Sequence, residues 1–285
     1  MQKEIKVLFQ VEEQDLEAFK ESLINNEKSN LTIEKYMRDV RHFLVWLEGR
    51  EITKAETLAY KAYLSDNYAI SSVNSMISSL SAWLKYIGRS ECCVKTLKVQ
   101  RSVFCSERKE LTKGEYGRLL QAAKRDKRLV LLMRTIAETG IRVSEHRFIT
   151  VEAVQKGIVE VRCKGKIRTI LLPRQLCKEL LSYARGKNIG SGCVFRTRIG
   201  QPLNRSYIWT QMKKLCEAAK VIAEKVFPHN LRHLFARTFY SIEKDVVRLA
   251  DILGHSSINT TRIYTIESGS IHRHQIEKVS LYYMT

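Results

Sequence analysis

The sequence has no paired-cysteine motif and no long apolar run, and these absences narrow the class of protein. The seven cysteines are odd in number, scattered and free of any C-x-x-C pair. This argues against a disulfide framework or a cysteine–zinc module, and it favours reduced thiols in a cytoplasmic protein. The sequence also has no apolar segment of membrane length, no signal-peptide pattern and no lipidation motif, so we expect no membrane role.

Proline and acidic residues are also scarce. There are three prolines among 285 residues and many helix formers, which predicts a mostly helical chain. Lysine and arginine number 49 against 30 aspartates and glutamates, giving a formal net charge of +19. Such a field attracts polyanions, so nucleic acid is the expected partner. The length suits one large domain or two ordinary ones.

Apolar spacing in the first part of the chain predicts a small helical domain, residues 1–90. In residues 31–49 the apolar positions recur every three or four residues, and Gly49 closes the helix. Residues 70–88 repeat this pattern, and two further helices are expected around residues 12–26 and 53–66. The periodicity fades in residues 91–110, which we interpret as a linker.

The second domain, residues 111–285, is expected to be mainly helical with one small β-hairpin. Thr112 and Glu115 form a capping box at the start of a helix, and the following apolar segment stops at Gly140. The apolar period then changes to two on either side of "CKGK", which predicts a hairpin with Gly165 at its turn. After Pro173 we expect helices to the end of the chain.

The stretch "HNLRH", residues 229–233, raises the question of a metal site, because two histidines four apart share a helical face. The metalloprotease motif needs a glutamate after the first histidine, and Asn230 stands there. Arg232 would also repel a metal ion. Taken alone, the motif is most simply a histidine packed in the core, but it does not stand alone.

Two other stretches carry residues suited to phosphate chemistry. "TGIRVSE" places Arg142 just after a helix-ending glycine, and "LGHSSINTTRIYT" places His255 nine positions before Tyr264. Together with His229 and Arg232 on one helical face, these side chains suit the holding of a phosphodiester while a nucleophile attacks it.

These three ordered stretches resemble the boxes of the tyrosine recombinase (phage integrase) family, in the plan of the Xer-type enzymes. The resemblance covers nearly the whole chain. It implies that the first domain is a core-binding (SAM-like) domain, that the second is catalytic, and that the two form a C-shaped clamp around DNA. It also implies a site-specific recombinase that cleaves and rejoins DNA and needs no metal and no nucleotide.

The resemblance implies a role for each candidate residue. Arg142 and Arg232 would hold the non-bridging oxygens of the scissile phosphate. Tyr264 would attack phosphorus, giving a 3′-phosphotyrosine and a free 5′-hydroxyl. His229 would assist the transfer of the phenol proton, and His255 would hydrogen-bond the phosphate or align the tyrosine.

The remaining candidate residues lie in the hairpin, in the first box ("TGIRVSE") and in the "HNLRH" stretch. Lys164 resembles the family's mobile lysine, the general acid for the leaving 5′-oxygen; Lys166 is the alternative two residues on. Glu145 is expected to orient its neighbours. His233 is expected to be a structural hydrogen-bonding histidine.

The segment after the first box departs from the family pattern. His146 and Arg147 stand where family members usually carry leucines, which puts the local packing in doubt. Ordinary roles remain the alternatives for single residues: a core tyrosine, a helix-end histidine, a solvated arginine.

The expected partners are double-stranded DNA with paired half-sites and further copies of this chain, as a tetramer on DNA, with accessory proteins possible. A short amphipathic tail after Tyr264 is expected either to dock on a neighbouring subunit or to fold back. Two other functions stay open, a type IB topoisomerase and a DNA-binding protein without catalysis. The target sequence and the biological setting, among dimer resolution, integration or excision of a mobile element, and inversion, also stay open.

Overall fold

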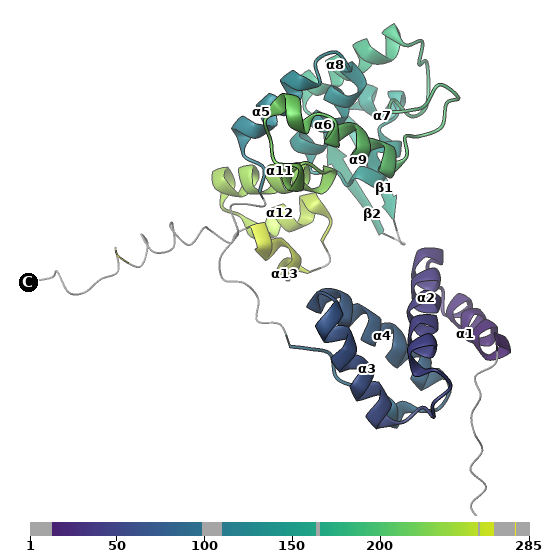
Figure 1. Cartoon of the computed structure of the whole chain (residues 1–285). Coiled ribbons are helices and arrows are strands. Elements are labelled where there is room, and N and C mark those ends of the chain that lie inside the picture. Colours follow the sequence, from purple (N-terminus) through teal and green to yellow (C-terminus); the bar gives the residue numbers. More distant parts are fainter. Residues whose placement is uncertain (1–12, 99–109, 164–165, 256, 265–276, 278–285) are drawn as a thin grey trace, which may run out of the picture. The chain divides into compact units, whose positions relative to one another are not determined.

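The chain divides into two compact units, Met1–Arg101 and Ser102–Thr285. The computed structural model describes residues 13–98, 110–163, 166–255, 257–264 and 277 (Figure 1). Both units are built mainly of helices, as the sparse proline content predicts. Among the described residues, no helix is both long and apolar enough to cross a membrane.

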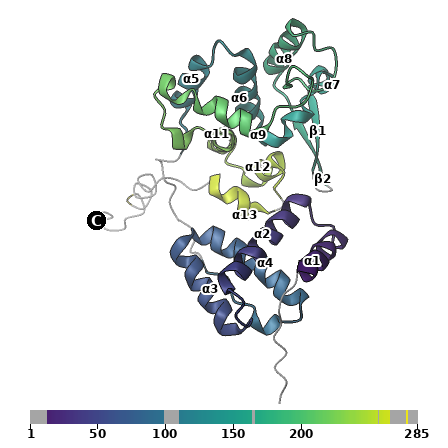
Figure 2. The ribbon, with the colours of Figure 1, turned by 45° about the vertical axis from the view of Figure 1, so that its right-hand side comes forward.

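The described residues of the first unit form four α-helices, as predicted. Their apolar faces meet in one core around Phe43 and Trp83, which are fully buried. α2 and α4 pack against each other, which the views of Figures 1 and 2 both show. The helices are α1 (Glu13–Asn25), α2 (Asn30–Leu47), α3 (Lys54–Asn67) and α4 (Ile70–Tyr86).

The segment from residue 90 to residue 98 packs on this first unit. A short 3-10 helix, η1 (Ser90–Cys92), buries Cys92, and its carbonyl accepts a hydrogen bond from the Thr57 hydroxyl (2.7 Å). Asn74 holds the backbone of Leu97 through both ends of its amide. The expected linker therefore starts later than residue 91, because these polar contacts anchor an irregular segment that has no helical period. Residues 99–109 lie outside the described residues.

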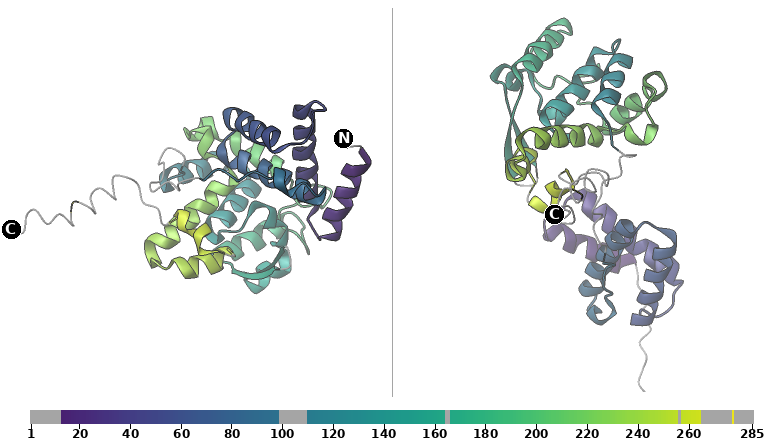
Figure 3. Two further views of the ribbon diagram at one scale, coloured as in Figure 1. Left: turned by 90° about the horizontal axis from the view of Figure 1, so that it is seen from below. Right: turned by 90° about the vertical axis from the view of Figure 1, so that its left-hand side faces the viewer.

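The second unit has its own core, in which α6 packs against both α8 and α11. Figure 3 shows α11, in yellow-green, as the long helix of this unit. The capping box of Thr112 and Glu115 is confirmed at the start of α5. The α-helices are α5 (Lys113–Ala122), α6 (Lys127–Thr139), α7 (Val151–Lys156), α8 (Arg174–Gly186), α9 (Arg205–Lys213), α10 (Cys216–Ala219), α11 (Pro228–Glu243), α12 (Val246–Leu253) and α13 (Ile258–Thr261), and the 3-10 helices are η3 (Val143–Phe148), η4 (Ala223–Lys225) and η5 (Arg262–Tyr264).

The predicted hairpin is confirmed as β1 (Ile158–Cys163) paired antiparallel with β2 (Lys166–Leu171), with Cys163 opposite Lys166. Val159 and Val161 face the core. In β2 the inward positions are Ile170 and Arg168, whereas Ile167 and Leu171 are exposed. Ile167 and Leu171, the apolar residues of the alternating pattern, therefore lie on the outer face of β2, and Arg168 lies on the inner face beside Ile170.

The chain after Pro173 is not helical throughout, contrary to expectation. Residues 187–204 form an irregular segment with two isolated β-bridges, Thr150↔Cys193 and Arg196↔Pro202. Val194 and Phe195 in this segment are buried, so the segment is held by core contacts and by the bridge to the distant Thr150. Such contacts leave no local period in the sequence. Residues 265–276 and 278–285, which include the predicted tail, lie outside the described residues.

Candidate active site

Arg232 lies where the ends of two helices meet. The last carbonyls of a helix lack partners within the helix, and here two of them face the Arg232 guanidinium. Nη1 donates to the carbonyl of Gly140, at the end of α6, and Nη2 donates to that of Leu253, at the end of α12 (2.8 Å). Arg232 itself comes from α11. One side chain thus joins three helices.

Gly140 is needed at this junction for two reasons. Its φ of +65° lies in the left-handed region, and a Cβ there would come within 2.5 Å of a ring carbon of Phe235 and 2.9 Å of Leu253. Glycine alone both ends α6 and lets α11 approach. The placement of Arg232 therefore depends on a residue 92 positions earlier in the chain.

Arg232 is buried, with 1% of the residue exposed. Only some of the N–H groups of its guanidinium donate to a partner within the protein. Nη2 makes a second contact, 3.0 Å to Nε2 of His255. Nε is buried with no hydrogen-bond partner among the described residues. Burial, together with the nearby charges of Arg142 and Arg168, lowers the pKa of Arg232 to about 10. An anion would find in Nε and Nη1 two remaining N–H groups.

His255 is held as a neutral imidazole of one tautomer. Because arginine can only donate, Nε2 of His255 must accept from Arg232. Nδ1 therefore carries the proton and donates to the hydroxyl of Thr261 (2.8 Å), which is fully buried. Burial and the charge of Arg232 lower the pKa of His255 to about 4. At neutral pH this residue adds no charge to the site.

Tyr264 lies beside these groups in η5 and is 4% exposed. Its ring stacks on that of His255 (centroids 6.1 Å apart) and meets that of His233 edge-on (5.0 Å). Burial raises the pKa of the phenol, while the neighbouring Arg232 and Arg142 oppose that rise. The tyrosine is therefore protonated at neutral pH, and a proton acceptor is needed before it can act as a nucleophile.

His229 and His233 form a pair one turn apart on α11, with ring centroids 4.6 Å apart. His229 is the exposed member, and partial burial and Arg232 lower its pKa. The pKa of His233 falls to about 4, chiefly through burial. Nε2 of His233 has no hydrogen-bond partner among the described residues. His233 therefore packs against Tyr264, and its expected role as a hydrogen-bonding histidine stays a prediction.

Arg142 and Glu145 are joined as expected from the first box. The Glu145 carboxylate is buried and accepts from the backbone N–H of Arg142 (2.8 Å) and from its Nη1 (3.0 Å). The Arg142 side chain is 39% exposed, and its Nη2 lies 3.4 Å from the carbonyl of Gly254. The first and third boxes therefore meet in space, although 112 residues separate them.

Arg168 was not predicted and belongs to the same group of side chains. It donates to the other side of the Glu145 carboxylate and, through Nη1, to the carbonyl of Ile252 (3.0 Å). No sequence signal pointed to Arg168, because the apolar alternation of Ile167 and Leu171 assigns residue 168 to the opposite, polar face of the predicted strand.

The two departures from the family pattern are accommodated. His146 is buried against Phe195, and its Nδ1 contacts the carbonyl of Val143 at 2.5 Å. Burial lowers the pKa of His146, which keeps it neutral. Arg147 stays exposed with its guanidinium over the ring of Phe148. The histidine thus fills a core position of η3 as a neutral ring.

The lysine candidates are not placed. Lys164 lies outside the described residues, and of Lys166 only the backbone, the first position of β2, is described. Among the residues that the structure does describe, no group of three or more histidine, cysteine, aspartate or glutamate side chains could hold a metal ion.

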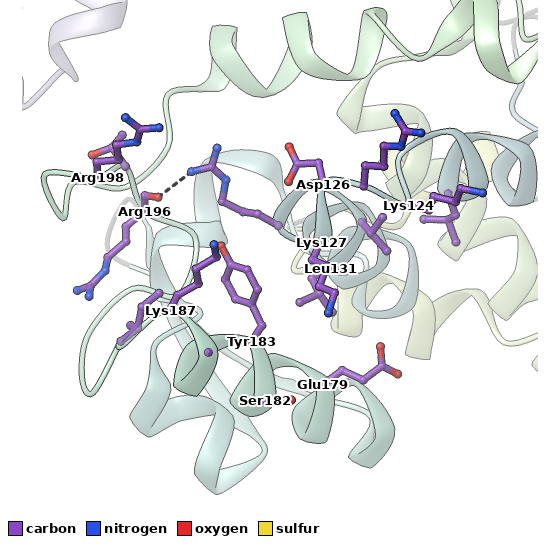
Figure 4. A pocket seen from close by; sticks show the side chains of 17 residues that line it. Lys124, Asp126, Lys127, Leu131, Glu179, Ser182, Tyr183, Lys187, Arg196 and Arg198 are labelled. Carbon is purple, nitrogen blue, oxygen red and sulfur yellow. Dashed lines mark hydrogen bonds between the residues drawn. The ribbon is translucent and has the colours of Figure 1, made fainter.

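A basic groove of about 1310 Å³ lies elsewhere on the second unit, between the ends of α5, α6 and α8 and residues 196–198 (Figure 4). Its wall includes the Arg128 guanidinium, which donates to the carbonyl of Arg196 (3.1 Å) and to the hydroxyl of Tyr207 (3.0 Å). The cationic residues that line it are Lys124, Arg125, Lys127, Arg128, Lys187, Arg196 and Arg198. None of the candidate site residues lines this groove.

Family models match both units. The model described as the phage integrase family matches residues 109–269, and that described as the phage integrase N-terminal SAM-like domain matches residues 9–92. The tyrosine recombinase XerA of Pyrococcus furiosus is 31% identical over 279 residues, covering 93% of this chain and 94% of that protein. The tyrosine recombinase XerD of Vibrio cholerae is 28% identical over 256 residues, covering 82% and 85%.

Solved structures of the same kind share the fold. A crystal structure of XerA recombinase matches with a TM-score of 0.53 and 26% identity, covering 95% of this chain and 99% of that one. A lambda integrase dimer bound to a core site matches with a TM-score of 0.72 and 19% identity, covering 90% and 95%. With the spatial meeting of the three sequence boxes, these matches lead to one conclusion: the chain belongs to the phage integrase family.

Proposed function

We propose that this chain is a site-specific recombinase that cleaves and rejoins duplex DNA through a 3′-phosphotyrosine formed on Tyr264. The observation that carries the proposal is the convergence of Arg142, Arg232, His255 and Tyr264 from three separate stretches of the sequence. Relatives described as tyrosine recombinases support it. Neither a type IB topoisomerase nor a DNA-binding protein without catalysis has comparable support.

The arginines would hold the phosphate. Arg232 offers Nε and one proton of Nη1 from a fixed position, and the more exposed Arg142 offers a guanidinium that can reach outward. A planar fork matches the two non-bridging oxygens and stabilises the charge that builds on them at the pentacovalent stage. The four carbonyl and carboxylate contacts of these arginines hold them in place before substrate arrives.

Tyr264 would attack phosphorus while its proton leaves toward an imidazole. His229 is our proposed acceptor, on the basis of the family resemblance. His233 and His255 are the imidazoles in ring contact with Tyr264, and both are neutral at pH 7. Because Nε2 of His255 is occupied by Arg232, His255 would align the tyrosine and the arginine rather than take the proton.

The bond from phosphorus to the 5′-oxygen breaks as the tyrosine ester forms, and the departing oxygen takes a proton from Lys164. The reverse reaction, attack by a 5′-hydroxyl on the phosphotyrosine, rejoins the strand. The phosphodiester bond energy is kept in the ester, so no nucleotide is needed.

We further propose that residues 1–90 act as the core-binding domain and residues 111–285 as the catalytic domain, and that the two clamp duplex DNA. Solved relatives include a lambda integrase dimer on a core site and a lambda integrase tetramer on a Holliday junction. By analogy, this chain would bind paired half-sites as a tetramer in the cytoplasm.

The test separates the nucleophile from the acid. An alkoxide leaves poorly unless it is protonated, and acid catalysis contributes about 10² to 10⁴ in rate. A bridging 5′-sulfur leaves readily, since thiol pKa values lie near about 8.5. We expect Lys164→Ala to be slow on normal DNA and largely rescued on a 5′-phosphorothiolate substrate. Tyr264→Phe should form no adduct on either.

The measurement is the yield of covalent protein–DNA adduct on a denaturing gel. If the sulfur substrate rescues Lys166→Ala instead, the general acid is Lys166 and not Lys164. An adduct formed by Tyr264→Phe would contradict the assignment of the nucleophile. Relaxation of plasmids regardless of their sequence would favour the topoisomerase.

A further inference from the structure

Arg168 connects three segments of the second unit from the inner face of β2. Its side chain is 13% exposed. Nη1 donates to the carbonyl of Ile252 in the last turn of α12, and Nη2 donates to the Glu145 carboxylate in η3. The hairpin is thereby tied to both the first and the third sequence box.

Gly254 leaves the space that Arg168 fills. The φ of Gly254 is +64°, and a Cβ at this position would overlap the side chain of Arg168. The same glycine precedes His255, and its carbonyl lies 3.4 Å from Nη2 of Arg142. The turn that presents His255 is therefore packed directly on Arg168.

Glu145 lies between two guanidiniums. It accepts from the side chain of Arg142 on one side and from that of Arg168 on the other, and it is 3% exposed. Arg168 is a second cation beside the Glu145 carboxylate, so its charge repels the Arg142 guanidinium and offsets part of the attraction of Glu145. Without Arg168 this repulsion would be lost, and Glu145 would draw the Arg142 guanidinium inward.

We propose that Arg168 is a positioning residue for DNA cleavage: it shares the Glu145 carboxylate so that Arg142 can reach the scissile phosphate, and it braces the turn that carries His255. This inference rests on the proposed function. Arg168 itself touches no substrate. It acts on Arg142, which does contact the substrate, and on the backbone of the turn that carries His255.

The first measurement compares Arg168→Gln with wild type on a nicked substrate that traps the covalent adduct. We expect cleavage to slow by about 10- to 100-fold, the range seen when the hydrogen-bond partners of ligating side chains are removed. DNA affinity should stay within about twofold of wild type, because the Arg168 side chain is only 13% exposed and donates to Glu145 and Ile252 inside the unit.

Arg134→Gln is the matched control. Like Arg168, Arg134 has a largely buried side chain (21% exposed), but its ion pairs are with Glu138 of α6 and Glu179 of α8. Its loss should lower the melting temperature without slowing cleavage. Equal slowing by both variants would mean that Arg168 only stabilises the fold, and the proposal would be wrong.

A double-mutant cycle tests whether Arg168 acts through Arg142. If it does, the rate loss of Arg142→Lys combined with Arg168→Gln should be clearly smaller than the product of the two single losses, since coupled defects do not add. The part that still adds reports the bracing of the turn that carries His255. Fully additive defects would overturn the proposal. If Arg168→Gln does not fold, Arg168→Lys replaces it in the cycle, because lysine keeps the charge but cannot hold two acceptors in a fork. Wild-type protein that forms no adduct would refute the proposed function itself, whereas a wild-type adduct with an unaffected Arg168 variant refutes only this inference.

Discussion

His233 and His255 are neutral at pH 7 because burial lowers the pKa of each, and the charge of Arg232 lowers it further. Among the described side chains, the site therefore carries its positive charge on guanidiniums. This arrangement links the stability of the fold to pH.

We predict that the free energy of unfolding falls as the pH is lowered from 7 to 5. The pKa of His233 is about 4 in the folded protein against an ordinary 6.5. Between these values the unfolded chain binds a proton that the folded chain does not, so acid favours unfolding. The contribution is fully present above about pH 6.5 and is lost as the pH falls toward 4. Urea titrations of wild type and His233→Phe at several pH values measure it.

His233→Phe keeps a ring against Tyr264 and removes the titrating group. Its stability should therefore depend less on pH over this window than that of wild type. Parallel curves for the two proteins would contradict the assignment of a depressed pKa to His233.

The sequence could predict which residue types the site needs but not how they are held. The spacing of His229 and Arg232 places them on one helical face, and the structure agrees. The carbonyl partners of Arg232 belong to Gly140 and Leu253, 92 and 21 residues away. No local pattern encodes such partners. Arg168 was missed for the same reason, since its significance comes from the Glu145 carboxylate on another segment.

Among the elements, those with a cap or a strong period were predicted well. Gly140 marks the end of α6, the capping box begins α5, and the change of period locates the hairpin. Residues 187–204 were mistaken for helix because their order depends on core contacts and on a bridge to the distant Thr150. In the predicted linker 91–110, residues 91–98 are held on the first unit by hydrogen bonds from α3 and α4, which leave no local period in the sequence.

The junction of α6 and α11 gives a prediction about these elements. Gly140 and Gly157 both end helices with a positive φ, but only at Gly140 would a Cβ meet other atoms. Gly157→Ala should lower the free energy of unfolding by about 1–2 kcal/mol, the cost of a left-handed alanine. Gly140→Ala should cost clearly more, because it also displaces Phe235. Denaturant titration of both variants provides the comparison.

Gly140→Ala should also slow adduct formation, since the Gly140 carbonyl holds Arg232. Gly157→Ala serves as the control, with cleavage near wild type. Equal stability losses in the two variants would show that α11 yields to the methyl group without cost.

At the scale of the whole molecule, the charge of +19 predicts how binding responds to salt. Each phosphate that the protein neutralises releases condensed counterions, so log affinity should fall linearly with log salt, with a slope of about −0.9 per contact. Fluorescence anisotropy with a labelled duplex gives this slope. An affinity that hardly changes between low and high salt would mean that the basic side chains are merely solvated.

The two units have separate hydrophobic cores, and this has a consequence for heating. Because the core around Trp83 shares no member with the core of the second unit, each unit can absorb heat and melt in its own step. Scanning calorimetry of the DNA-free chain should record two transitions. Trp83→Leu should lower the melting temperature of one transition and Gly140→Ala that of the other. Each unit would thus have its own melting temperature, and a DNA duplex bound by both units should raise the two melting temperatures together.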